Sequence, residues 1–209
     1  MFGDVTKLSN GLSRHLIIFA RQPVLGRVKT RLAADIGDTA ALAVYRELLT
    51  ITATAVGAAG IPATVWLADA PDLPTAELPE WPGLPWLLQP AGDLGHRMAA
   101  AFATAFVAGA SAVAIIGTDC PGLRAAHLEQ AFELLQHHDI VLGPATDGGY
   151  YLLAMKELHM LLFANKEWST ATVRAATLAD AARLGLRVAL LPQLADVDTV
   201  ADLRAWRGE

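Results

Sequence analysis

The chain has 209 residues, with 16 Lys and Arg side chains against 21 Asp and Glu and a formal net charge of -5. This length predicts one large domain or at most two small ones, and the 54% hydrophobic content excludes a mainly disordered chain. The acidic balance excludes general nucleic-acid binding, which needs clustered excess Lys and Arg. Cys120 is the only cysteine, so an intramolecular disulfide and a thiolate-rich zinc site are excluded, and a cytoplasmic location is expected.

Two uncharged stretches, 48–68 and 98–117, are long enough to cross a bilayer. Alanine supplies much of both, and Gly, Thr, Ser or Pro residues interrupt them, so neither has the Leu, Ile and Phe density of a membrane span. Each is predicted to be a helix that ends in a glycine turn and continues into a buried strand. Residues 1–13 lack the apolar core of a signal peptide. We therefore expect no membrane span.

Short apolar runs rich in β-branched residues alternate along the chain with longer helical patterns. The runs LIIF and VAIIG are apolar at consecutive positions, as strands buried on both faces require. The predicted strands are 15–20, 63–67, 86–89, 112–117, 140–143, 150–155 and 187–191. The predicted helices are 30–36, 39–58, 94–108, 125–138, 170–184 and 200–207, with Asp38, Asp93 and Ser169 as the N-caps of the second, third and fifth.

This alternation predicts an α/β fold with a mostly parallel sheet covered by helices on both faces. The strands that begin near 140 and 150 are too close for a helical crossover, which predicts a local antiparallel strand. Residues 69–86 contain five prolines and form a stiff surface connection. Because the alternation continues beyond that connection, one domain over 1–209 is expected.

Ligands of open α/β sheets bind beyond the carboxyl ends of the strands, so the loops there carry the candidate site. The loop after strand 15–20 holds Arg21, Arg27, Lys29 and Arg31, four of the 16 cations in 11 residues. Gly26 widens the range of backbone conformations open to this loop, and the helix that follows offers free N–H groups to an anion. The loop lacks the glycine spacing of a P-loop or a Rossmann fingerprint. It predicts a phosphorylated ligand, with a solvated basic helix start as the alternative.

Asp119 follows the most apolar predicted strand, within the segment GTDCPG. A carboxylate at a strand tip is well placed to hold Mg²⁺ or Mn²⁺ against phosphates. The alternatives are a cap of the helix near 125 or an Asx-turn. Cys120 is predicted to be a buried small residue rather than a nucleophile.

The loop TDGGY, from Thr146 to Tyr150, places an acid beside two glycines. Gly148 and Gly149 allow the backbone to approach a ligand closely, and Asp147 can accept a hydrogen bond from a hydroxyl or act as a base. A plain turn between two strands uses the same residue types, so that interpretation stays open.

Two further loops carry polar candidates. Asp196 and Asp198 lie two residues apart and can share a cation, although Asp198 is equally suited to cap the last predicted helix. Asp93 and Arg97 lie at the start of the helix 94–108 and form a weaker candidate for nucleotide binding.

Six motifs occur in one order over about residues 15–206: RQPVLGRVKTRL, QPAGDLGHRM, GTDCPGL, TDGGYYLL, WSTATV and DVDTVADL. Together they resemble the bacterial GT-A-like glycosyltransferase family long catalogued as a domain of unknown function. That family resembles the nucleotidyltransferases of the molybdenum-cofactor guanylyltransferase and phosphoenolpyruvate guanylyltransferase kinds. The resemblance implies a three-layer α/β/α sandwich of the nucleotide-diphospho-sugar transferase type, with a nucleotide over the first half of the sheet.

The resemblance also implies roles for single residues. Asp119 matches the family's metal carboxylate, Asp198 matches a second metal carboxylate of related nucleotidyltransferases, and 147–149 match the acceptor loop. Gly26, Arg27, Lys29 and Arg31 match the phosphate loop. Residues 19–23 replace the glycine-rich opening of nucleotidyltransferases, which favours a diphospho-sugar donor, although the Asp-x-Asp motif of many glycosyltransferases is absent at Asp119.

The expected function is therefore metal-dependent glycosyl transfer from a nucleotide-diphospho-sugar to an unidentified acceptor. Metal on Asp119 and the charge of Lys29 would stabilise the leaving diphosphate, and Asp147 would orient or deprotonate the acceptor. One alternative is nucleotidyl transfer from a nucleoside triphosphate with pyrophosphate release. Another is a noncatalytic nucleotide-binding protein. The base, the sugar and the oligomeric state stay open.

Overall fold

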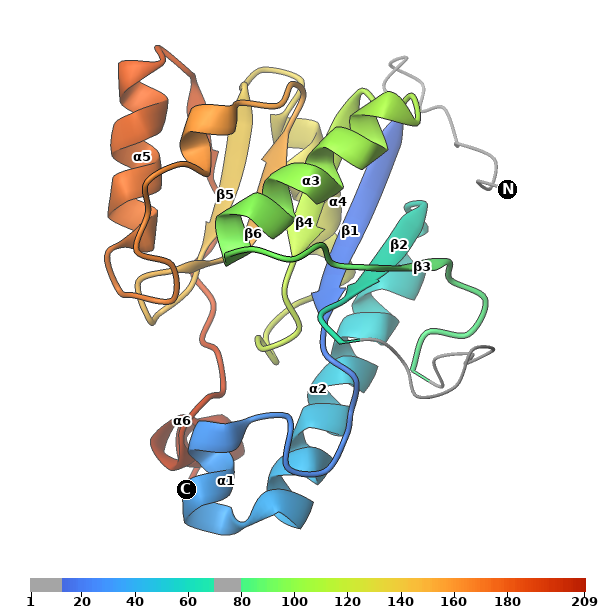
Figure 1. Cartoon of the computed structure of the whole chain (residues 1–209), viewed down its shortest axis with the longest axis vertical. Helices are drawn as coiled ribbons and strands as arrows, with labels where there is room; N and C mark the ends of the chain where they lie inside the picture. Colours follow the sequence, from blue (N-terminus) through green and yellow to red (C-terminus); the bar gives the residue numbers. More distant parts are fainter. Residues whose placement is uncertain (1–12, 70–79) are drawn as a thin grey trace.

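The computed structural model describes residues 13–69 and 80–209, and within them seven strands form one sheet in the order β3-β2-β1-β4-β6-β5-β7. Figure 1 shows helices on both faces of this sheet. The strands are β1 (Arg14–Ala20), β2 (Ala63–Leu67), β3 (Trp86–Leu88), β4 (Ala112–Ile116), β5 (Ile140–Pro144), β6 (Tyr150–Met155) and β7 (Val188–Leu190). The helices are α1 (Thr30–Ile36), α2 (Asp38–Ala59), α3 (Leu94–Val107), α4 (Ala125–Leu134), α5 (Val173–Arg183) and α6 (Val200–Arg207), with the 3-10 turn η1 at Met160–Leu162.

Successive residues of each central strand enter opposite core clusters because side chains alternate across a sheet. In β1, Leu16 and Ile18 pack with residues of α2 and α4, whereas Ile17 packs with residues of α3 and α5. All three side chains are fully buried. The predicted arrangement, a sheet covered on both faces, is therefore confirmed.

The strand β6 runs antiparallel to both of its neighbours, β4 and β5, and the other pairings are parallel. The predicted antiparallel strand is thus confirmed. The carboxyl ends of the six parallel strands consequently lie along one edge of the sheet. At this edge β1 and β4 are neighbours although α1, α2, β2, β3 and α3 lie between them in the chain, so the chain changes direction across this pair.

Two predicted helix caps are wrong. Asp38 is the first residue of α2, and Gly37 precedes it with a φ of 83°, because α1 ends at the same glycine. Ser169 lies outside α5, which follows Thr172, and its own φ of 63° is left-handed. The predicted helix 125–138 ends at residue 134, whereas Asp93 caps α3 as predicted by accepting the N–H of His96 at 2.8 Å.

Part of the predicted proline-rich connection, including Pro71, Pro74 and Pro79, lies outside the described residues, as do residues 1–12. Among the helices of 13–69 and 80–209, none combines the length and apolarity needed to cross a membrane.

A third cluster lies beyond the carboxyl edge of the sheet, where α1 and α6 pack on the N-terminal half of α2 (Figure 1). Its buried side chains include Leu32 of α1, Leu48 of α2 and Val197, which precedes α6. The backbone N–H of Val197 also donates to the carbonyl oxygen of Asp119 at 3.0 Å. Burial of Val197 therefore fixes the chain between Asp196 and Asp198 beside the end of β4.

The helix α6 is held by a capping box between Thr199 and Asp202. The backbone N–H of Asp202 donates to Thr199 Oγ1 at 3.3 Å, and Asp202 Oδ2 accepts the N–H of Thr199 at 2.8 Å and that of Asp198 at 3.1 Å. Thr199 therefore caps α6, and the predicted alternative in which Asp198 is the cap is wrong.

The substitution Thr199→Ala should lower the free energy of unfolding by about 1 kcal/mol because the cap is lost. Thr54→Ala is a matched control, since the Thr54 hydroxyl is exposed and bonds only within α2. Urea denaturation of the two variants checks this difference. Equal effects of both substitutions would show that the capping box does not stabilise the fold.

Candidate functional site

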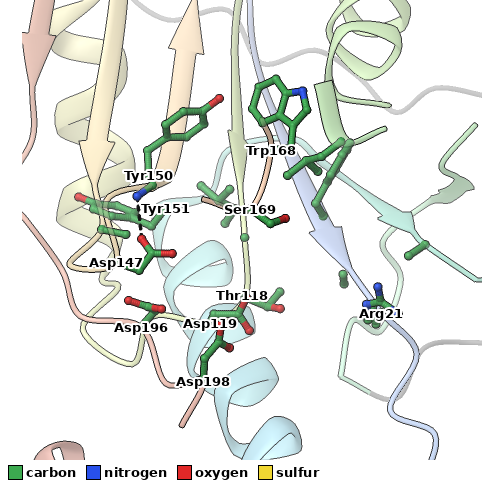
Figure 2. Close-up of a pocket in the computed structure, with 18 of the residues that line it drawn as sticks. Arg21, Thr118, Asp119, Asp147, Tyr150, Tyr151, Trp168, Ser169, Asp196 and Asp198 are labelled. Carbon is green, nitrogen blue, oxygen red and sulfur yellow. Dashed lines mark hydrogen bonds between the residues drawn. The ribbon is translucent and has the colours of Figure 1, made fainter. Parts of the chain in front are cut away.

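A cavity of about 710 Å³ opens at the carboxyl edge of the sheet. Its walls come from the loops after β1, β4 and β5, from the start of α3 and from the segment that precedes α5. Figure 2 shows the carboxylates of Asp119, Asp196 and Asp198 gathered at one end, with Asp147 beside them and Trp168 toward the other end. Most of the predicted site residues line this cavity: Arg21, Arg27, Lys29, Arg31, Asp93, Arg97, Asp119, Asp147, Gly149, Tyr150 and Asp198.

Lys29 connects the basic loop to two of these carboxylates. Its ammonium lies between them, in an ion pair with Asp119 Oδ1 and 2.8 Å from Asp198 Oδ1. The Lys29 side chain is only 4% exposed, whereas those of Asp119 and Asp198 are 48% and 39% exposed. The ammonium is thus buried beneath two carboxylates that remain open to the cavity.

The fold explains this convergence. Lys29 follows β1 and Asp119 follows β4, and these strands are adjacent at the point where the chain changes direction. The backbone hydrogen bond from Val197 to Asp119 places the next residue, Asp198, beside Asp119 and Lys29. Lys29 also has a left-handed backbone, with a φ of 48°, which is uncommon for a residue with a Cβ and typical of functional positions.

The two carboxylates keep Lys29 charged. Burial acts to lower the pKa of Lys29, but attraction to Asp119 and Asp198 and the hydrogen bonds to them outweigh it, so the pKa lies above its ordinary value. Two acidic oxygens therefore surround one cation position.

The donor set at this position fits a divalent cation. Mg²⁺ and Mn²⁺ prefer oxygen ligands, and Mg²⁺ is commonly held by one or two carboxylates together with substrate phosphates. In the part of the chain that the structure describes, no group of three His, Cys, Asp or Glu side chains is arranged to hold a metal. A cation on Asp119 and Asp198 would thus take its other ligands from a bound phosphate or from water.

The loop after β5 brings a further acid to the cavity. Asp147 Oδ1 accepts the N–H of Gly149 at 2.7 Å, which fixes the carboxylate. Thr146 does not line the cavity; it donates to Asp196 Oδ1 at 3.1 Å. Burial and the charge of Asp147 raise the pKa of Asp196. The loop therefore presents Asp147 to the cavity and anchors itself through Asp196.

Two predicted glycines support the site from outside the cavity lining. Gly148 has a φ of 90°, and a Cβ there would overlap the backbone of Ala171. Gly26 has a φ of 74° in the basic loop. Cys120 is buried as predicted, and burial raises the pKa of its thiol.

Other predicted residues also have structural partners. The hydroxyl of Tyr45, on α2, accepts the N–H of Arg21 at 2.9 Å and donates to its carbonyl oxygen at 3.0 Å. Asp93 caps α3, and Arg97 Nε donates to the carbonyl oxygen of Gly92 at 2.8 Å. Tyr45 was not predicted as a site residue because it lies within a helix rather than in a loop after a strand.

The segment 168–170 lines the cavity and was not among the predicted site residues. Gly95 of α3 allows its close approach, since a Cβ there would lie 2.5 Å from the Trp168 indole. The ion pair between Lys166 and Asp180 of α5 anchors the same segment, and the Lys166 side chain is 1% exposed. The motif WSTATV, which contains this segment, was the sequence feature that could have identified it as part of the site.

Comparisons with known proteins bear on the family and the fold. The family model described as "Uncharacterized protein conserved in bacteria (DUF2064)" matches residues 51–170. A search of functionally curated proteins gives no match. A protein from Desulfovibrio desulfuricans G20, provisionally described as a nucleotide-diphospho-sugar transferase, is 31% identical; the match covers 92% of this chain and 85% of that chain, with a TM-score of 0.85.

Two more distant structures share the fold alone. A cytidylyltransferase from Leptospira borgpetersenii serovar Hardjo-bovis (strain JB197) is 15% identical, over 94% of this chain and 85% of that chain, with a TM-score of 0.59. The Rv0371C protein of Mycobacterium tuberculosis H37Rv, solved in complex with manganese, is 18% identical, over 92% and 96%, with a TM-score of 0.54. The predicted fold of the nucleotide-diphospho-sugar transferase type is confirmed. Because the family model spans more than half of the chain, and a 31% identical structure covers most of it, the chain belongs to the DUF2064 family of bacterial proteins.

Proposed function

We propose that this protein is a metal-dependent transferase that uses a nucleotide-activated donor, and that it moves a glycosyl group from a nucleotide-diphospho-sugar to an acceptor hydroxyl. One observation carries the proposal: a single cavity joins the basic loop after β1 to a pair of carboxylates around one cation position. Phosphate oxygens and a divalent cation are complementary to these two groups. The similarity to the Desulfovibrio protein and the manganese complex of the mycobacterial structure support the same chemistry.

The basic loop would bind the diphosphate. Arg27 and Arg31 are exposed and line the cavity on either side of Lys29 in the sequence. Their N–H groups can donate to phosphate oxygens. The cavity volume of about 710 Å³ lies within the range of small-molecule sites. On this assignment the negative charge of the donor is matched locally although the whole chain is acidic.

The transfer step needs a group that takes a proton. The acceptor oxygen attacks the anomeric carbon, the bond between that carbon and the diphosphate oxygen breaks, and the nucleoside diphosphate leaves with the electron pair. The acceptor proton passes to Asp147, whose Oδ2 is not used in the hydrogen bond to Gly149. Lys29, Arg27 and Arg31 stabilise the leaving group. A divalent cation on Asp119 and Asp198 would supply further Lewis-acid stabilisation of that charge.

Nucleotidyl transfer is the second candidate. Asp119 and Asp198 come from segments that are far apart in the sequence and converge on one position, as a metal held by two carboxylates requires. The cytidylyltransferase from Leptospira shares the fold. In this reaction an acceptor oxygen attacks the α-phosphorus of a nucleoside triphosphate, the bond to the bridging oxygen breaks, and pyrophosphate leaves.

Asp119→Asn should weaken the Mn²⁺-dependent part of nucleotide binding by about tenfold or more, because one of the two cation ligands loses its charge. Calorimetry with a panel of nucleoside diphosphates, with and without Mn²⁺, measures this. Asp35→Asn is the matched control, since Asp35 is exposed on α1 and does not line the cavity. Unchanged Mn²⁺-dependent affinity in Asp119→Asn would refute the metal assignment.

The released product should distinguish the two reactions. We expect ³¹P NMR to show a nucleoside diphosphate formed from a sugar nucleotide in the presence of Mn²⁺ and a mixture of hydroxyl acceptors. The Asp119→Asn variant serves as the negative control. If pyrophosphate forms from a nucleoside triphosphate and no sugar nucleotide is cleaved, the reaction is nucleotidyl transfer and not glycosyl transfer.

Asp147→Asn should lower kcat by about 10²-fold or more while leaving the KM for the donor within about threefold, because the variant loses the proton acceptor and keeps the phosphate contacts. Steady-state kinetics on the donor identified above measures both constants. A large rise in the KM for the donor with unchanged kcat would place Asp147 in donor binding instead.

A further inference from the structure

The cation position between Asp119 and Asp198 already holds a positive charge. Lys29 Nζ bonds one oxygen of each carboxylate, and its side chain is almost completely buried. Two partly exposed carboxylates that converge on one position repel each other, so the pair is less favourable without a cation between them. The ammonium of Lys29 therefore performs the charge compensation that a divalent cation would supply.

An ammonium and a divalent cation cannot occupy this position together. Both are positive and would be held by the same two carboxylates, so their mutual repulsion at that distance would be large. We propose that Lys29 and the divalent cation compete for the position between Asp119 and Asp198, and that the cation enters when phosphate oxygens of the donor draw the ammonium away. This inference rests on the metal assignment of the proposed function and adds a rule for when the metal binds.

A phosphate bound beside Lys29 would offer its ammonium a second set of hydrogen-bond acceptors. Arg27 and Arg31 flank Lys29 in the sequence, and all three line the same cavity. A diphosphate bound to the arginines would offer the ammonium acceptor oxygens close by. The long side chain of lysine is flexible, so the ammonium can exchange a carboxylate for a phosphate without movement of the backbone.

This exchange has a thermodynamic consequence. A ligand that removes the competitor strengthens binding of the other ligand, so phosphate and metal should bind with positive coupling, each favouring the other. In the absence of phosphate, Lys29 should keep metal affinity low. The protein would then select the complete metal–nucleotide pair over the free metal ion.

The test is the affinity for Mn²⁺ alone, without nucleotide, followed by the loss of the free Mn²⁺ signal in electron paramagnetic resonance. Lys29→Met should bind Mn²⁺ about tenfold more tightly than the unsubstituted protein, because the competitor is gone and two carboxylates are left uncompensated. Arg46→Met removes the same charge from an exposed position on α2 that does not line the cavity, and its affinity should stay within about twofold. The double variant Lys29→Met/Asp119→Asn should lose the gain.

Lys29→Arg provides a second variant that retains the charge, in case Lys29→Met does not fold. It should bind Mn²⁺ no more tightly than the unsubstituted protein. Thermal unfolding is an independent measurement: Mn²⁺ should raise the unfolding midpoint of Lys29→Met more than that of the unsubstituted protein.

The outcomes separate this inference from the function on which it rests. If Lys29→Met binds Mn²⁺ with equal or lower affinity while Asp119→Asn still weakens Mn²⁺-dependent nucleotide binding, the proposed competition is overturned and the metal assignment stands. If neither the unsubstituted protein nor any variant binds Mn²⁺, with or without a nucleotide, both are overturned.

Discussion

The ion pairs of Lys29 with Asp119 and Asp198 hold the candidate site together. They join three segments that are far apart in the sequence: the loop after β1, the tip of β4 and the chain before α6. The sheet order brings the first two together, and the buried Val197 adds the third through its hydrogen bond to Asp119. The capping box of α6 then fixes the backbone of Asp198. Loss of any of these supports would alter the spacing of the carboxylates around the cation position.

The same interaction explains how an acidic chain can accommodate a phosphorylated ligand. The net charge of -5 would repel anions if it were spread evenly. The structure instead gathers both basic side chains and carboxylates in the lining of one cavity. On our proposal a divalent cation connects the carboxylates to the phosphates, so both charge types serve one ligand. Lys29 would alternate between the carboxylates and the phosphates.

Much of the fold was predictable because buried strands and helices have different periods. The strands β2 and β6 and the helices α1 and α6 have the predicted bounds. The caps at Asp38 and Ser169 were mispredicted because several polar residues compete at each helix start, and the choice depends on backbone angles set by the shared Gly37 and by tertiary packing around 169.

Only part of the candidate site followed from the sequence. The residues after β1, β4 and β5 were found because ligands bind at the carboxyl ends of parallel strands. Trp168 and its neighbours escaped this rule, since they follow the antiparallel β6 and return to the cavity through η1 and the anchored Lys166. The contact between Lys29 and the two carboxylates depends on strand order, which spacing in the sequence does not specify.

The most direct test of this account is a crystal structure of the protein with Mn²⁺ and the nucleoside diphosphate that it binds most tightly. We predict anomalous density for Mn²⁺ on Asp119 and Asp198, with the ammonium of Lys29 moved onto the diphosphate. A nucleotide bound elsewhere, or Mn²⁺ away from these carboxylates while Lys29 still lies between them, would contradict the account.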